Sequence, residues 1–364
     1  MISYKKELDL LIKVGRLRER KVYSDDLLDL ASNDYLGLAS NKKLFKKAYK
    51  RVLKHNNHSP KASILVNGYS NIHKKFEQKL CKINGFEAGV VVGSGFLANI
   101  SLIESLVRKK DILFIDEQYH ASGILASKLV QGSVITFKHN DYNDLEKLII
   151  EHKEENSRII IAIEGVYSMY GDIAPKEFND VANKYDTLLI VDEAHSSGVI
   201  GQNLLGWYDY WGIKPQYNHI KMGTLGKAYG SYGAYILGSK QIISFLENRA
   251  KPIIYSTAPS LFDIALAFEN LKYIMKNKKY IAKKISKYQN IIQKYLDISC
   301  DALIVPIEIN DNKKVLKIQN NLIKEGFLVG AIRQPTVQKA ILRVIIKLDI
   351  RKSDLKKITN LLKL

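Results

Sequence analysis

The middle of this chain alternates short apolar runs with amphipathic segments. Of all the features of the sequence, this alternation most strongly restricts the fold that the chain can adopt. A run that is apolar at nearly every position is typical of a strand buried on both faces. The segments between the runs, such as residues 96–108, place apolar residues at helical spacing. We therefore predict an α/β fold with a mainly parallel sheet covered by helices. The apolar runs are at residues 89–93, 112–115, 159–163, 187–191, 219–222 and 233–238.

The pattern changes after about residue 265, where a long helical stretch precedes a short series of apolar runs and helices. This change predicts a smaller α+β domain at the C-terminus. The first residues contain a helical segment followed by LDLASNDYLGLA (28–39). We therefore expect three parts, with an N-terminal segment at 1–40, a large domain at 41–265 and a small domain at 266–364.

The formal net charge of +19 raises the possibility of a nucleic-acid partner. The lysines are spread along the chain, however, and the densest basic stretch, 271–296, has apolar residues at helical spacing, as in a solvated helix face. The chain begins with charges among its apolar residues, unlike a signal peptide, and no apolar run approaches the ~20 residues that cross a bilayer. We expect a cytoplasmic protein with no nucleic-acid or membrane partner.

Ligand sites of parallel sheets lie beyond the carboxyl ends of the strands, so the residues after each run are the first candidates. The run at 89–93 leads into GSGFLAN (93–99), which fits the pattern G-x-G-x-x-A. That pattern is compatible with a dinucleotide site, with a phosphate held by the amides of a helix N-terminus, or with a tight turn that only needs glycine. All three interpretations stay open at this point.

Three further strand ends carry polar side chains. Asp192 and His195 follow the run at 187–191, and an acidic residue that emerges from a buried strand needs a cationic or hydrogen-bonding partner. His120 and Ser168 follow two other runs, although a single histidine is often structural. The two cysteines and the scattered acids and histidines show no second cluster at metal-ligand spacing, so we expect no metal.

Lys227 stands in GTLGKAYGSYG (223–233), after the run at 219–222. A Walker A loop requires glycine at 221 and a hydroxyl residue at 228, whereas the chain has Lys221 and Ala228. A lysine, a carboxylate, a histidine and a phosphate-binding helix end at one edge of a sheet suit pyridoxal phosphate (PLP) instead. In such a site the lysine forms a Schiff base and the carboxylate keeps the pyridine nitrogen protonated.

Along almost its whole length the chain resembles the α-oxoamine synthases, PLP enzymes of the aspartate-aminotransferase-like fold (fold type I). The resemblance implies a large PLP-binding domain followed by a smaller C-terminal domain. The motifs that carry it are SNDYLGLA (32–39), NGYSNIH (67–73), GSGFLAN (93–99), QYHAS (118–122), EGVYSMYGD (164–172), VDEAHSSGVIG (191–201), GTLGKAYG (223–230), IIYSTAPS (253–260) and GAIRQPTV (330–337).

The resemblance implies a role for each residue at a matching position. Lys227 would form the Schiff base, Asp192 would pair with the pyridine nitrogen and His120 would stack on the ring, which makes these three the expected catalytic residues. Further expected cofactor contacts are Gly95, Phe96, Ser168, His195, Thr224 and, from the neighbouring subunit of a homodimer, Ser256 and Thr257. The expected substrate-binding residues are Arg18, Asn33, Arg333, Thr336 and Arg343.

The reaction that the resemblance implies is the decarboxylative condensation of an amino acid with an acyl thioester. The expected substrates are L-alanine and a pimeloyl thioester of CoA or acyl carrier protein, in biotin biosynthesis, and the alternative pair is glycine with acetyl-CoA. A dehydrogenase that binds NAD through GSGFLA (93–98) is a more remote alternative. Relatives commonly have a glycine-rich run where this chain has SPKASILVNGY (59–69), with Ile64 and Leu65, which leaves the acyl-chain preference open.

Overall fold

The structure is a computed structural model that describes residues 4–153 and 157–363. Contacts between residues divide the described chain into two compact units. The large unit contains Leu36–Ser168 and Asp172–Lys283, and the small unit contains the segments before and after it together with Met169–Gly171. This grouping differs from the three consecutive parts expected from the sequence, because the N-terminal segment belongs with the C-terminal residues. The last turns of the large unit extend past residue 265.

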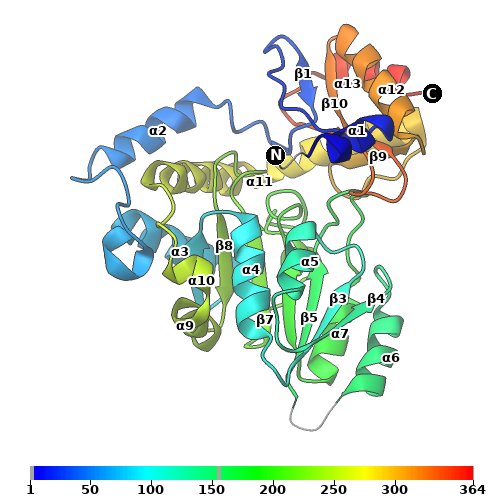
Figure 1. The fold of residues 1–364 in the computed structure, drawn as a ribbon. Helices are drawn as coiled ribbons and strands as arrows, with labels where there is room; N and C mark the ends of the chain where they lie inside the picture. The colour runs from blue at the N-terminus through cyan, green and yellow to red at the C-terminus, as the bar shows by residue number, and fades with distance from the viewer. Residues whose placement is uncertain (1–3, 154–156, 364) are drawn as a thin grey trace. The chain divides into compact units, whose positions relative to one another are not determined.

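The large unit is built on a seven-stranded sheet (Figure 1) with the order β2-β8-β7-β6-β5-β3-β4. β8 is antiparallel to both of its neighbours, and every other pair is parallel, which confirms the prediction of a mainly parallel sheet. The strands are β2 (Ala88–Val92), β3 (Ile112–Asp116), β4 (Ser133–Phe137), β5 (Ile159–Glu164), β6 (Leu188–Asp192), β7 (His219–Thr224) and β8 (Ala234–Gly238). Of these, β4 was not predicted.

Helices pack on this sheet because their apolar side chains meet those of the strands. α4 crosses β7 and β8, where Leu102 and Ile103 are fully buried in the core (Figure 1). The helices of the large unit are α2 (Lys42–Val52), the π-helix η1 (Ile64–Gly68), α3 (Asn71–Asn84), α4 (Gly95–Leu106), α5 (Ala121–Ser127), α6 (Tyr142–His152), α7 (Glu177–Lys184), α8 (Trp207–Tyr210), α9 (Lys240–Arg249) and α10 (Lys251–Ile254). The long helix α11 (Leu261–Leu296) begins in the large unit and ends in the small one.

The small unit has a four-stranded sheet with the order β1-β10-β11-β9. β1 pairs in parallel with β10, so that Leu28 lies opposite Phe327, and this pairing explains why the first residues belong to the C-terminal unit. The elements are α1 (Lys5–Lys13), β1 (Leu28–Leu30), β9 (Ile304–Glu308), α12 (Asn312–Lys324), β10 (Phe327–Ile332), β11 (Ile341–Ile345) and α13 (Lys352–Leu361).

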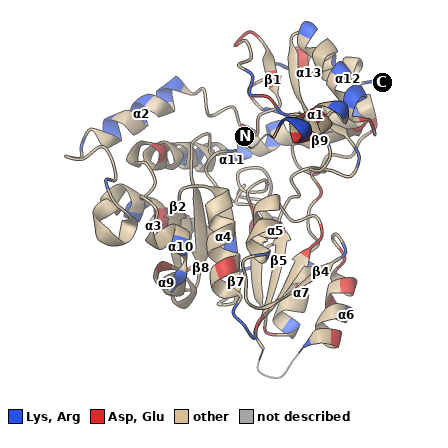
Figure 2. Cartoon of the chain, in the orientation of Figure 1, with Lys and Arg blue, Asp and Glu red and all other residues tan. Residues whose placement is uncertain are grey.

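The basic residues are distributed over both units (Figure 2), with several on α2 and on α12. In the described ranges of the chain no helix is both long enough and apolar enough to cross a membrane.

Candidate active site

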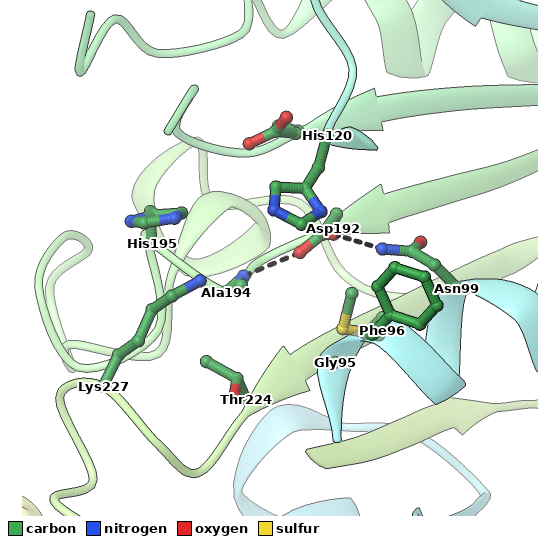
Figure 3. A pocket seen from close by; sticks show the side chains of 11 residues that line it. Gly95, Phe96, Asn99, His120, Asp192, Ala194, His195, Thr224 and Lys227 are labelled. Carbon is green, nitrogen blue, oxygen red and sulfur yellow. Dashed lines mark hydrogen bonds between the residues drawn. The ribbon is translucent and has the colours of Figure 1, made fainter. Parts of the chain in front are cut away.

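A pocket of about 150 Å³ opens at the carboxyl edge of the large unit's sheet (Figure 3). Several neighbouring strands supply its walls, and α4 supplies one side. The lining residues are Gly95, Phe96, Asn99, His120, Glu164, Asp192, Ala194, His195, Met222, Thr224 and Lys227. Seven of the residues predicted from the sequence are in this set, namely Gly95, Phe96, His120, Asp192, His195, Thr224 and Lys227.

The order of the strands explains why residues distant in sequence meet here. Glu164, Asp192 and Thr224 are the last residues of β5, β6 and β7, which are adjacent in the sheet. The register places Glu164 directly opposite Asp192. His120 caps the N-terminus of α5, just after β3, the next strand in the sheet. Because these strands are parallel, their carboxyl ends deliver all four side chains to one edge.

The N-terminus of α4 forms one end of the pocket. The Ser94 side chain caps this helix by accepting a hydrogen bond from the Leu97 amide at 3.3 Å. A side chain is absent at Gly95, where a Cβ would lie 3.9 Å from the Cβ of Thr224. The first amides of a helix have no partner within the helix and carry a partial positive charge. Together with the nearby Thr224 hydroxyl, this end of the pocket suits a phosphate group.

Asp192 forms the floor of the pocket and is almost completely buried. Its Oδ1 accepts a hydrogen bond from the Ala194 amide at 3.0 Å, and its Oδ2 accepts one from Asn99 Nδ2 at 2.9 Å (Figure 3). Two donors hold the carboxylate in one orientation, facing the cavity. Asn99 was not among the predicted site residues, although it is a polar residue one turn after Gly95, in the apolar first turns (GFLANI) of the helix. That position is a signal that could have identified it.

Glu164 is a second buried acid of the pocket that the sequence analysis did not select. It ends the apolar run IIIAI, and 2% of its surface is exposed. Its Oε2 accepts a hydrogen bond from the Ser168 amide at 3.2 Å, and its Oε1 has no hydrogen-bond partner among the described residues. Burial and the nearby Asp192 charge raise the pKa of Glu164 well above its ordinary value, against the effect of Lys227.

His120 and Lys227 approach the same space from opposite sides of the pocket (Figure 3). His120 keeps solvent access, but loss of hydration around its ring lowers its pKa, and the Lys227 charge adds to this effect while Asp192 opposes it. The imidazole is therefore neutral near pH 7, and an amine, a carboxylate and a neutral imidazole share one cavity. Such combinations are typical of catalytic sites.

The other predicted cofactor contacts do not line this pocket. Ser168 is buried beside Glu164. Ser256 and Thr257 lie between α10 and α11, and Thr257 is exposed. The role expected for these two residues requires a second copy of the chain, and it stays a prediction. Among the described residues no group of three or more His, Cys, Asp or Glu is placed to hold a metal ion.

Four of the five predicted substrate-binding residues form two hydrogen-bonded pairs within the small unit. Arg343 is buried in β11 and donates from Nη1 to Asn33 Oδ1 at 2.9 Å. Arg18 donates from Nη2 to the Thr336 hydroxyl at 2.9 Å. Arg333, directly after β10, donates to the backbone carbonyls of Gly15 and Leu17, so its guanidinium holds the segment after α1 beside the end of β10.

Comparison with known proteins agrees with this fold and pocket. The family model for aminotransferase class I and II matches residues 25–357. The chain is 44% identical over 360 residues to the 8-amino-7-oxononanoate synthase of Helicobacter pylori, covering 99% of this chain and 96% of that protein. It is 35% identical over 338 residues to the enzyme of the same name from Petrotoga mobilis, covering 90% and 86%.

Solved structures show the same fold. Serine palmitoyltransferase from S. paucimobilis, solved with bound PLP and myriocin, has a TM-score of 0.89 at 23% identity and covers 98% of this chain and 95% of that one. The 8-amino-7-oxononanoate synthase of Francisella tularensis has a TM-score of 0.75 at 26% identity, covering 93% and 97%. The chain belongs to the aminotransferase class I and II family. Within that family it is a member of the α-oxoamine synthases, and 8-amino-7-oxononanoate synthases are among its most similar relatives.

Proposed function

We propose that this chain is an acyltransferase that condenses L-alanine with a pimeloyl thioester, releases the thiol and CO2, and forms 8-amino-7-oxononanoate with PLP as its cofactor. One observation carries the proposal. Lys227, Asp192 and the N-terminus of α4 line a single pocket in a chain that is 44% identical to a named 8-amino-7-oxononanoate synthase over nearly its whole length.

The residues of the pocket fit PLP. The cofactor has an aldehyde, a pyridine nitrogen and a phosphate, and the pocket offers an amine, a buried carboxylate and the start of a helix. A side chain at Gly95 would fill the space between α4 and Thr224. The unpartnered Oε1 of Glu164 provides a further polar contact for a bound group. When bound, PLP supplies a ring that draws electrons away from the α-carbon of an amino acid.

Each pocket residue would then have a separate task. Lys227 would hold the cofactor through Nζ and, once the amino acid has taken its place, would accept the α-proton. Asp192, fixed by Ala194 and Asn99, would keep a proton on the ring nitrogen. The imidazole of His120 would cover the ring, and His195 would hydrogen-bond its phenolic oxygen. Thr224 and the first amides of α4 would bind the phosphate, with Phe96 beside it.

The small unit would supply the substrate-binding groups. Arg343, oriented by Asn33, would bind the carboxylate of alanine, because a guanidinium can form two parallel hydrogen bonds with it. Arg18 and Thr336, which are already hydrogen-bonded to each other, would contact the acyl substrate, with Arg333 holding the adjacent backbone in place.

We further propose that the active form is a cytoplasmic homodimer, in which Ser256 and Thr257 reach the phosphate in the partner's site. One observation in favour is the exposed apolar face of α2 and its end. Phe45, Tyr49 and Leu53 follow one another at four-residue spacing, and about half of each side chain's surface is exposed. A second copy of the chain would bury this face. Sedimentation equilibrium would test the proposal, and a monomer with full activity would contradict it.

A direct test of the function is thiol release by the purified protein. We expect turnover with L-alanine and pimeloyl-CoA or pimeloyl-acyl carrier protein, and much slower turnover with glycine and acetyl-CoA. The opposite preference would assign the chain to glycine C-acetyl transfer. Comparing the two pimeloyl donors would identify the thiol carrier. A series of acyl-chain lengths would define the effect of residues 59–66, where Leu65 is half exposed.

The visible spectrum separates this proposal from a dehydrogenase. A PLP enzyme is yellow as purified, and its absorption changes when L-alanine is added. A colourless protein that binds NAD would contradict the proposal.

A further inference from the structure

A series of hydrogen bonds along one wall of the pocket joins the carboxylate of Asp192 to the imidazole of His120. Asn99 Nδ2 lies 2.9 Å from Asp192 Oδ2 and 2.9 Å from Ser122 Oγ. Ser122 Oγ lies 2.7 Å from His120 Nδ1. Asn99 and Ser122 are completely or almost completely buried and belong to different helices, α4 and α5. The series therefore links two of the expected catalytic residues through Asn99 and Ser122, neither of which has so far been given a role at His120.

The direction of the hydrogen bonds at Asn99 follows from its neighbours. An ionised carboxylate can only accept, so the Asn99 side that faces Asp192 must be the NH2 group. The Asn99 Oδ1 then faces Tyr119, whose hydroxyl donates to it at 2.8 Å. Burial raises the pKa of Tyr119 well above its ordinary value, which keeps this hydroxyl protonated. The two hydrogens of Asn99 Nδ2 are then directed to Asp192 and to Ser122.

Two donors then point at the Nδ1 atom of His120. The Ser122 backbone amide, which can only donate, lies 3.2 Å from Nδ1. Since Ser122 Oγ accepts from Asn99, its own hydrogen is free to donate to Nδ1. Among the described residues, the Ser122 hydroxyl has two side-chain hydrogen-bond partners, Asn99 Nδ2 and His120 Nδ1. A buried hydroxyl hydrogen without an acceptor is unfavourable, so both donors require a lone pair on Nδ1.

We propose that Asn99 and Ser122 are positioning residues that hold neutral His120 in the tautomer with its hydrogen on Nε2. Nδ1 is then occupied by the two donors, and Nε2 carries the hydrogen. Nε2 can therefore donate a hydrogen bond to a ligand in the pocket but cannot accept one. His120 thus acts as a donor to an oxygen of the bound substrate, and the orientation of Asn99, set by Asp192, keeps it so. The catalytic meaning of this arrangement rests on the proposed function, whereas the tautomer itself does not.

The neutral state of the ring is consistent with its surroundings. Loss of hydration lowers the pKa of His120, and the Lys227 charge acts in the same direction, while Asp192 opposes both. Without the Asn99 donor, the serine hydroxyl could rotate and accept a hydrogen bond from Nδ1–H, and the ring could then take either tautomer. The tautomer is therefore the property that distinguishes a positioning role from a structural one.

Solid-state ¹⁵N NMR of the full chain, labelled with ¹⁵N-histidine and measured with and without PLP, tests the proposal. The two nitrogens of a neutral imidazole give well-separated signals according to which one carries hydrogen. Subtracting the spectrum of His120→Gln identifies the signals of His120 among the eight histidines. At a pH where the ring is neutral, we expect an unprotonated Nδ1 and a protonated Nε2.

Two variants remove one link each. Asn99→Ala frees the serine hydroxyl to accept from Nδ1, and Ser122→Ala removes the hydroxyl donor while the backbone amide remains. In both, we expect the ratio of the Nδ1–H to the Nε2–H tautomer to rise about fivefold, the effect of one neutral hydrogen bond. Ser122→Thr keeps a hydroxyl and should restore the original ratio. Ser101→Ala is the matched control, because Ser101 is a buried serine on α4 whose hydroxyl donates to the Leu97 carbonyl instead.

A wild-type spectrum with hydrogen on Nδ1 of His120 would overturn the proposal without any variant. An unchanged tautomer ratio in both Asn99→Ala and Ser122→Ala would also overturn it. If Asn99→Ala does not fold, Asn99→Leu is the alternative, since leucine has nearly the size and branching of asparagine but lacks the donor to Ser122. It should raise the ratio of the Nδ1–H to the Nε2–H tautomer by a similar factor. A correct tautomer in a chain that shows no thiol release would contradict the proposed function and leave this inference intact.

Discussion

Two lysine–acid sets come from β6, β7 and the residues that follow these strands, and they differ in what surrounds them. The closed set consists of Lys221 and Glu193, which are 1% and 0% exposed and whose Nζ and Oε1 atoms are 3.3 Å apart. The open set consists of Lys227 and Asp192, which line the pocket. Asp192 and Glu193 are consecutive residues, so the chain directs one acid to the cavity and the next into the protein.

The closed set is surrounded by protein donors and acceptors. Glu193 Oε2 accepts hydrogen bonds from the Ser196 hydroxyl and the Trp207 amide, each at 2.6 Å, and Lys221 also donates to the Leu205 carbonyl. The two charges of this set are therefore balanced by each other and by hydrogen bonds from neighbouring protein groups. Removing one partner of such a buried ion pair leaves an unpaired charge inside the protein, whereas groups that face a cavity can act on a ligand. The comparison therefore separates a structural role from a catalytic one.

The largest expected effect is on the open set. Lys227→Ala should reduce kcat by about 10⁴-fold, or about 5 kcal/mol in activation free energy, because it removes the group that accepts the α-proton. The free energy of unfolding of the cofactor-free chain should change by less than about 1 kcal/mol. Thiol release and urea unfolding measure the two quantities. Lys214→Ala, at an exposed lysine shortly before β7, is the control, and full activity of Lys227→Ala would refute the assignment.

The closed set should show the reverse. Lys221→Met leaves Glu193 buried without its cation, which should lower the free energy of unfolding by about 3 kcal/mol or more. Adding Glu193→Gln removes the unpaired charge, and the double variant should recover a large part of that loss. Urea midpoints of the two variants measure this. If Lys221→Met were as stable as the wild type, Lys221 would not balance the Glu193 charge.

Asp192→Asn tests whether the open acid acts through its charge. Asparagine has nearly the same shape but cannot hold a proton on a ring nitrogen, so PLP should still bind while kcat falls about 10²-fold. The visible spectrum reports cofactor binding, and thiol release reports the rate. The loss should persist at saturating alanine, because the effect lies in the chemical step. A variant that lost PLP altogether would instead assign Asp192 to binding.

Much of this arrangement could be predicted from the sequence. A strand buried on both faces of a sheet is apolar at nearly every position, and strands of this kind were predicted correctly. Because ligand sites lie beyond the carboxyl ends of parallel strands, the residues after these runs were then searched, which led to His120, Asp192 and Lys227. β4 was missed because several of its side chains are exposed and its apolar run is interrupted. The position of a strand with such a mixed pattern depends on its neighbour β3.

The features that were missed depend on contacts between distant segments. Asn99 acquires its importance from Tyr119, Ser122 and Asp192, which the sheet brings together only after folding. The placement of the N-terminal segment depends on the pairing of Leu28 with Phe327, and no local pattern reveals a partner that far along the chain. Local chemistry identified the residue types of the site, whereas the links between them required the structure.

The smallest expected effect concerns Glu164, the acid that lies opposite Asp192 in the open edge of the sheet. Its pKa in the folded chain is raised by burial and by Asp192, so the folded state keeps a proton that the unfolded state loses above about pH 4.5. Stability contributed by this group should therefore fall as the pH rises above that value. Glu164→Gln cannot titrate, and its amide resembles the protonated acid. Relative to the wild type, the variant should become more stable as the pH rises from about 5 towards 8, by at most about 1.4 kcal/mol per pH unit, measured by urea unfolding. A stability difference that stays constant over this range would mean that Glu164 ionises normally, and that the open edge carries two negative charges instead of one.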